Sequence, residues 1–211
     1  MTIHHCRFVF LLSLAGLALV ACGGGGGGGA APTPAPQAGV IALPKTGQTT
    51  CSDAFGVIIA CTGTGQDGEL QTGVAEPSPR FTVDGTGNCI TDNLTGLMWT
   101  RNANLPTGQS TWQAALDFAN TLNLCGFTDW RLPNRKELRS LINYSLADNA
   151  TALNVLGFSN VQADSYWSSS HVANSAGFAW IVAMGGVNPA GGVDTVNKSS
   201  SLFVWPVRAG Q

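Results

Sequence analysis

An unbroken run of glycines at positions 23–29 is the feature that most limits what this chain can fold into. Glycine has no side chain to bury and loses more conformational entropy on ordering than any other residue, so this run cannot belong to a hydrophobic core. The prolines that follow stiffen the segment towards an extended conformation. We therefore predict a tether over residues 22–45, followed by about 165 residues that are sufficient for one domain with its own core.

The segment before the glycines has the pattern of an export signal. Arg7 precedes an apolar stretch over residues 8–20, and Cys22 follows it. This stretch is too short to span a bilayer. The pattern resembles the bacterial lipoprotein signal, which implies cleavage before Cys22 and acylation of that cysteine. An ordinary secretory signal with an incidental cysteine is the alternative.

The lipoprotein resemblance carries an expectation about location. It makes residues 1–21 a signal peptide and predicts an exported protein that is attached to the membrane by the lipid on Cys22. Because Gly23 rather than Asp follows the acylated position, the resemblance favours sorting to the outer membrane. We therefore expect a lipid-anchored protein of the bacterial cell envelope.

Charged residues are sparse, which excludes several kinds of partner. They make up 10% of the chain, and the net charge is −2. Binding to nucleic acid needs a dense basic surface, and binding to anionic lipid needs a polybasic segment, so neither partner is expected. One basic cluster exists, and we interpret it as the solvated face of a helix, with a contact to a small anionic glycan as the alternative. Its members are Arg131, Arg135, Lys136 and Arg139.

Four cysteines follow the tether, at Cys51, Cys61, Cys89 and Cys125. An even number of cysteines in an exported protein indicates two disulfides, for which three connectivities are possible. We prefer Cys51–Cys61, which closes a short loop, and Cys89–Cys125, which crosses the main domain. A metal site is the weaker alternative, because the sequence contains no C-x-x-C pair and His171 is the only histidine after the tether. We expect no metal and no cofactor.

The folded part divides into a small module over residues 46–80 and a larger domain over residues 81–211. The module is rich in Gly, Thr, Ser and Asp, and we expect loops held by a disulfide, with a short hairpin near residues 57–59. Residues 81–92 predict two short strands around a glycine-bearing turn, and residues 97–99 predict a buried strand.

Two helices are expected next. The first begins at Ser110, where Gln113 completes a capping box, and ends near Asn123. The second begins at Asn134, again with an acid three residues later, Glu137. Beyond residue 145 we expect no long helix, but an antiparallel, loop-rich half in which short runs of β-forming residues recur. These runs are residues 166–167, 178–182 and 202–207.

Five motifs from residue 95 onwards stand in an order that is typical of one family. They are Thr95-Gly-Leu-Met-Trp99, Trp112-Gln-Ala-Ala115, Asp129-Trp-Arg-Leu-Pro-Asn134 with Glu137-Leu138, Tyr166-Trp-Ser-Ser-Ser170 and Trp205-Pro-Val-Arg208. Together they resemble the Lcl C-terminal domain family, which is found at the end of a collagen-like bacterial adhesin, and the resemblance covers residues 81–208. The Arg-Leu-Pro-x-x-x-Glu core is also similar to C-type-lectin-like and formylglycine-generating-enzyme-like domains.

The resemblance implies an α+β fold of the C-type-lectin-like kind, with two helices and a twisted, loop-rich antiparallel sheet. In such a domain we expect Trp130 and Leu132 to lie in the core and Arg131 to pair with Glu137. The other tryptophans of the motifs and strands are also expected in the core, because each ring buries a large area. Trp180 is the exception best suited to stacking on a sugar, because loops flank its strand.

Enzymatic chemistry has little support in the sequence. His171 follows three serines, but adjacent residues do not build a catalytic triad, and nothing marks paired carboxylates. The catalytic cysteines of formylglycine-generating enzymes have no counterpart, because no cysteine follows Cys125. We expect no catalytic residue. Three residues with side-chain oxygens are closely spaced, but they do not match the pattern of a calcium-binding loop. They are Asp84, Asn88 and Asp92.

We therefore expect a binding module for a glycan or a host or cell-surface protein. A structural or assembly component of the envelope is the alternative, and an unrecognised hydrolase is a third. Small polar side chains on loops suit adaptable recognition. The candidate ligand-binding residues are Ser168, Ser169, Ser170, His171, Asn174, Ser175, Trp180, Asn188 and Asn197.

Overall fold

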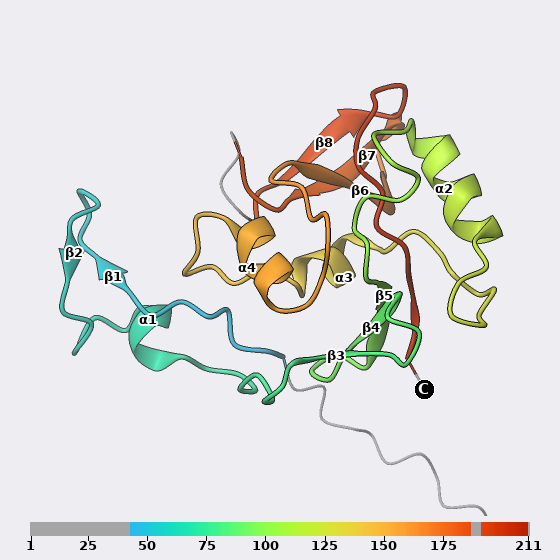
Figure 1. Ribbon diagram of the computed structural model, residues 1–211. Coiled ribbons are helices and arrows are strands. Elements are labelled where there is room, and N and C mark those ends of the chain that lie inside the picture. The colour runs from blue at the N-terminus through green and yellow to red at the C-terminus, as the bar shows by residue number, and fades with distance from the viewer. Residues whose placement is uncertain (1–42, 187–190, 211) are drawn as a thin grey trace, which may run out of the picture. The chain divides into compact units, whose positions relative to one another are not determined.

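The computed structural model describes residues 43–186 and 191–210. The predicted signal peptide, most of the tether, Cys22 and Asn188 lie outside the described residues. Within the described part of the chain, no helix is both long and apolar enough to cross a bilayer. The elements form a mixed α+β fold with three antiparallel sheets (Figure 1).

The first sheet is a two-stranded hairpin of β1 (Cys51–Ser52) and β2 (Ile58–Ile59). Its turn brings the amide of Gly56 to the carbonyl of Asp53, and Gly56 adopts a φ of 83°, which favours glycine. The short hairpin predicted near residues 57–59 is therefore present. Helix α1 (Asp67–Leu70) follows it. This helix was not predicted, because four residues are too few to show a helical period.

The second sheet has the strand order β3-β4-β5-β9. It contains β3 (Phe81–Val83), β4 (Cys89–Asp92), β5 (Leu97–Thr100) and β9 (Val207–Ala209). The first three strands lie where the sequence predicted them. The fourth comes from the end of the chain, because Trp99 of β5 pairs with Val207 of β9.

The third sheet is formed by β6 (Ser165–Val172), β7 (Ser175–Ala183) and β8 (Val193–Asn197), with β7 in the middle. In Figure 1 it lies at the top of the picture, whereas the β1–β2 hairpin lies at the left. The prediction of one twisted sheet is therefore wrong. The third run of β-formers, residues 202–207, forms only isolated bridges before β9, because its backbone passes between Ser110 and Tyr166.

The main domain has three helices, α2 (Trp112–Thr121), α3 (Arg135–Arg139) and α4 (Asn149–Val155). With α1, the described residues contain four helices, so the expectation of two is wrong. Helix α4 was missed because seven residues span only two turns. Its start is fixed by a side chain, since Asp148 accepts hydrogen bonds from the amides of Ala150 and Thr151.

The predicted start of α2 at Ser110 is also wrong. Ser110 instead pairs with Leu202 through two backbone hydrogen bonds, and its carbonyl accepts a further bond from the indole of Trp167. Thr111 is the N-cap residue, and its side chain makes no capping hydrogen bond. A tertiary bridge therefore displaces the capping box that the sequence pattern indicated.

The core contains two clusters of buried side chains. In the first, Trp205 meets Trp99 and Phe158 edge to face, with ring centroids 5.5 and 5.0 Å apart. The second packs Ala115 and Ala119 of α2 against the third sheet, including Trp167. Both preferred disulfides, Cys51–Cys61 and Cys89–Cys125, are present.

Candidate functional site

A shallow cavity of about 290 Å³ brings part of the predicted ligand-binding set to one place. It lies where the first turn of α3 meets the C-terminal part of β6 and the middle of β7, and we call it the Trp180 pocket. Its lining residues combine two cations, a histidine, an indole and two small polar side chains: Arg135, Lys136, His171, Trp180, Asn134 and Ser170.

The α3 side of the pocket is fixed by a capping box. Asn134 accepts hydrogen bonds from the amides of Lys136 and Glu137, and the Glu137 carboxylate accepts one from the Asn134 amide. The confirmed capping box explains why a helix of only five residues begins at this point. It also places Arg135 and Lys136 in the first turn of the helix, where both line the pocket.

The Arg131–Glu137 ion pair, also predicted from the sequence, supports this corner. Two hydrogen bonds of 2.7 and 2.6 Å join the guanidinium to the carboxylate. The hydrogen bonds that Arg131 donates to Glu137 raise the pKa of the guanidinium, against the opposing effect of burial. The amide of Arg131 also donates to the carbonyl of Val207 in β9. The loop before α3 is therefore held at both its backbone and its side chain.

Trp180 is half-buried, and Arg135 covers its ring. The guanidinium carbon lies 4.4 Å from the ring centroid, within the range of a cation–π contact. The amide of Arg135 is bound in turn by the Ser170 hydroxyl at 3.2 Å. Because Glu137 is engaged by Arg131, neither Arg135 nor Lys136 forms an ion pair within residues 43–186 and 191–210. The pocket therefore presents cations that lack a counter-ion in the protein.

The structure corrects the expected setting of the serines. Ser168, Ser169, Ser170 and His171 lie on strand β6, which has register irregularities after Trp167, rather than on a loop. Ser168 is fully buried, and its hydroxyl donates to the carbonyl of Trp180 at 2.6 Å. Its neighbours Tyr166 and Trp167 are fully buried as well, so both faces of β6 are covered at this point, which the polar sequence concealed.

Of the eight candidates among the described residues, only Ser170, His171 and Trp180 line the pocket. The others are buried, tied to the backbone or located on other edges of the third sheet. The sequence analysis interpreted Arg135 and Lys136 as part of a solvated helix face, with a contact to a small anionic glycan as the alternative. It did not include them among the candidate ligand-binding residues, whereas the structure places both in the lining of the pocket. The candidates that do not line the pocket are Ser168, Ser169, Asn174, Ser175 and Asn197, and Asn188 lies outside the described residues.

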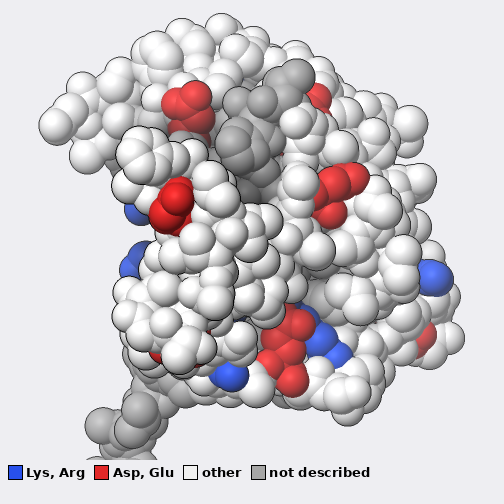
Figure 2. Space-filling view, turned by 90° about the vertical axis from the view of Figure 1, so that its left-hand side faces the viewer, with Lys and Arg blue, Asp and Glu red and all other residues white. Residues whose placement is uncertain are grey.

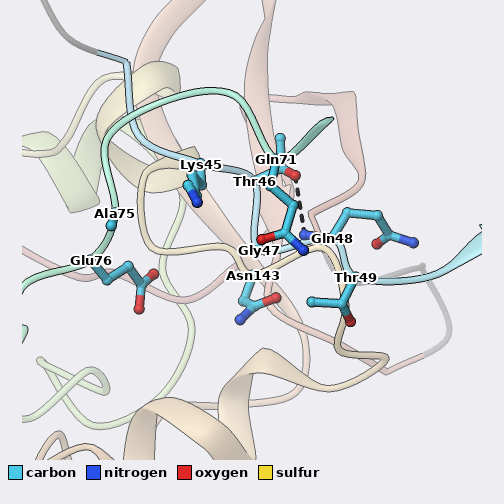
Figure 3. A pocket seen from close by; sticks show the side chains of 9 residues that line it. All are labelled: Lys45, Thr46, Gly47, Gln48, Thr49, Gln71, Ala75, Glu76 and Asn143. Carbon is cyan, nitrogen blue, oxygen red and sulfur yellow. Dashed lines mark hydrogen bonds between the residues drawn. The ribbon is translucent and has the colours of Figure 1, made fainter. Parts of the chain in front are cut away.

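A second cavity of about 210 Å³ lies between the N-terminal segment and the loop after α3 (Figure 3). Its walls are polar and aliphatic and include no aromatic ring or reactive group. Lys45 and Glu76 both line the cavity, but Glu76 already pairs with Arg80 at 2.5 Å. The amide of Tyr144 donates to the carbonyl of Thr46 beside it. This cavity therefore marks the junction between two chain segments, and it is a weaker candidate for recognition.

A cluster of Asp84, Cys89 and Cys125 has the spacing of metal ligands, but its groups are already engaged. The two sulfurs form a disulfide and cannot act as thiolate ligands. Partial burial acts to raise the pKa of Asp84, but hydrogen bonds from Thr86 and from the amide of Cys89 outweigh it, so the pKa is lowered. The cluster is therefore a hydrogen-bonded turn closed by a disulfide.

Residues 88–208 match the Lcl C-terminal domain. The chain belongs to the Lcl C-terminal domain family. The resemblance seen in the sequence motifs is thereby confirmed, and the match includes the whole Trp180 pocket. The β1–β2 hairpin and β3 precede the matched Lcl C-terminal domain residues. No curated protein matches the chain.

Proposed function

We propose that this protein is a non-catalytic, lipid-anchored module of the bacterial cell envelope that binds an acidic glycan in the Trp180 pocket. The observation that carries the proposal is the Arg135 guanidinium, stacked on Trp180 without a carboxylate partner among the described residues. A stacked guanidinium keeps its planar fork oriented, and such a fork matches a carboxylate or sulfate group. Membership in a family named after an adhesin supports an adhesive role.

The remaining parts of the proposal follow from the sequence. Acylation of Cys22 would anchor the protein, and the following Gly23 favours the outer membrane. The two disulfides suit an oxidising compartment outside the cytoplasm. We also propose a C-type-lectin-like fold, because short helices beside irregular antiparallel sheets agree with that class.

A non-catalytic role is supported by the geometry around His171. The Ser168 hydroxyl is committed to a backbone carbonyl, and within residues 43–186 and 191–210 no carboxylate forms a hydrogen bond with His171. A serine-dependent hydrolase needs a base that is oriented by a third group. Turnover of ester or glycoside substrates that is lost in His171→Ala would contradict this part of the proposal.

The binding proposal is tested with matched arginine variants of α3. We expect Arg135→Ala to weaken binding to a carboxylated or sulfated glycan about tenfold or more, because it removes a charge-assisted hydrogen-bond donor. Arg139→Ala removes the same charge from the same helix, but Arg139 binds the Tyr144 hydroxyl outside the pocket and should have little effect. Titration of the full chain against acidic and neutral glycans measures both.

Equal losses in the two variants would indicate attraction by general charge and would contradict the assigned pocket. An absence of saturable binding to any glycan would instead favour the structural or assembly role.

A further inference from the structure

The β1–β2 hairpin exposes an apolar tip that the proposed glycan site does not use. Phe55 is 92% exposed, Ile58 74% and Val57 59%, and Ile59 beside them is 39% exposed. Isolated exposed apolar residues are normal on a soluble protein, but neighbouring ones on a projecting turn indicate a contact surface. We call residues 55–59 the apolar tip.

The backbone of the apolar tip is largely hydrogen-bonded within the hairpin. The Asp53 carboxylate accepts hydrogen bonds of 2.9 Å from the amides of Phe55 and Val57, and the Asp53 amide donates to the Val57 carbonyl. The Cys51–Cys61 disulfide closes the base of the hairpin. Amides that already have a partner lose less free energy on leaving water. The tip can therefore enter an apolar phase without unfolding.

The charge around the tip indicates what kind of surface it meets. Residues 46–79 contain no lysine or arginine. Figure 2 shows the side of the molecule that carries β1 and β2 in Figure 1, and its charged groups are few and separated by uncharged surface. A surface of this kind gains nothing from an anionic partner, so its contact is apolar in origin. The acidic residues in this segment are Asp53, Asp67, Glu69 and Glu76.

Two occupants could cover the apolar tip, a second copy of the chain or a lipid bilayer. The tip has too few side chains for a stable protein interface, which takes roughly 20–30 residues a side. A bilayer has no such requirement, because shallow insertion of a few apolar residues adds to an existing anchor. Cys22 precedes the first described residue, Leu43, by a tether of about 20 residues with a root-mean-square reach of roughly 25 Å. The proposed lipid would thus keep the whole domain within reach of the membrane surface.

We infer that the apolar tip inserts into the lipid bilayer to which Cys22 is anchored and so orients the domain on the membrane. This inference rests on the lipid anchor of the proposed function. Strands β6 and β7, which carry Ser170, His171 and Trp180, lie on the side away from the hairpin in Figure 1. Insertion of the tip would therefore turn the third sheet away from the lipid.

The test places a fluorescent indole at the tip of the mature, acylated chain in phosphatidylcholine vesicles. In Phe55→Trp, the added emission should decrease when the lipid chains are brominated, because bromine quenches an indole only at close contact. The matched control is Val155→Trp on α4, where the native side chain is 83% exposed. Its added emission should be the same in both lipids. Replacing part of the lipid by an anionic one should not increase quenching at the tip.

The outcomes distinguish the inference from its premise. If the chain sediments with vesicles but Phe55→Trp emission is unchanged by bromine, the anchor stands and the tip insertion is wrong. If the wild-type chain does not sediment with vesicles, both the anchor and the insertion are wrong. The glycan-binding proposal is unaffected by this outcome, because it is tested by its own titration. If the added emission is not quenched and Phe55→Ser abolishes a concentration-dependent self-association, the tip is an interface between copies, and the insertion is again overturned.

Discussion

The individual tryptophans show how the same residue type takes different roles in one small domain. Trp99 and Trp205 are fully buried and meet edge to face, yet their indole N–H groups differ. The Trp205 indole donates to the carbonyl of Thr100 at 2.9 Å, whereas the Trp99 indole has no hydrogen-bond partner among the described residues. Trp180 remains half-buried under Arg135, and the proposed function assigns it to recognition.

The first prediction compares the two buried indoles. Replacing either Trp99 or Trp205 by phenylalanine removes similar ring area. Trp205→Phe should lower the free energy of unfolding by about 2 kcal/mol more than Trp99→Phe, because only the former deprives a buried carbonyl of a donor. Urea unfolding followed by circular dichroism measures both values. Equal losses would mean that the Thr100 hydrogen bond contributes little to stability.

At the scale of single elements, the ends of the short helices are fixed by side chains more than by helical propensity. Helix α3 depends on the capping box of Asn134 with Glu137, and α4 depends on Asp148. Helices of five and seven residues are too short to be stable alone in water. Their N-caps and their packing therefore decide whether they form.

The second prediction concerns the N-cap of α4. Asp148→Ala should lower the free energy of unfolding by about 1 kcal/mol near neutral pH, a usual value for loss of a capping side chain. The side-chain hydrogen bond from Thr151, with amide hydrogen bonds, lowers the pKa of Asp148 below its usual value of 3.8. A lowered carboxyl pKa stabilises the fold above the unfolded value, and this contribution is lost as the pH falls through the folded pKa.

The difference between wild type and Asp148→Ala should therefore shrink as the pH is lowered below 3.8. Thermal unfolding at several pH values measures it. The control is Asp117→Ala on the exposed face of α2, which removes the same charge without removing a cap. A difference that persists unchanged at low pH would show that the ionised carboxylate is not what caps α4.

At the scale of the whole molecule, long-range links join the ends of the Lcl C-terminal domain. Strand β9 pairs with β5, and Arg208 in β9 binds both oxygens of Asp129 at 2.7 and 3.1 Å. The Cys89–Cys125 disulfide ties β4 to the loop after α2, whereas Cys51–Cys61 closes only the N-terminal hairpin. The two disulfides therefore act on different parts of the chain.

The third prediction separates the two disulfides. Replacing Cys89 and Cys125 by alanine should lower the free energy of unfolding by about 3–4 kcal/mol, because the bond closes a long loop within the main domain. Replacing Cys51 and Cys61 should leave the tryptophan-detected transition nearly unchanged, since all six tryptophans lie between Trp99 and Trp205. Equal shifts in that transition would show that the hairpin and the main domain unfold as one unit.

The sequence alone was sufficient for features that depend on neighbouring residues. The capping box at Asn134, the Arg131–Glu137 pair, the hairpin near residues 57–59 and the first three strands of the second sheet all rest on local spacing, and the structure contains them. The family could also be recognised from the sequence, because five motifs stand in a fixed order along the chain.

Tertiary contacts decided the rest. The bridge to Leu202 displaced the start of α2 from Ser110, and pairing with β7 turned the serines into a strand with Ser168 inside. The Trp180 pocket joins α3 to strands that follow much later in the chain, so residue spacing could not place Arg135 over Trp180. Local hydrogen bonding and charge therefore determine the elements, whereas the proposed binding surface depends on packing between distant segments.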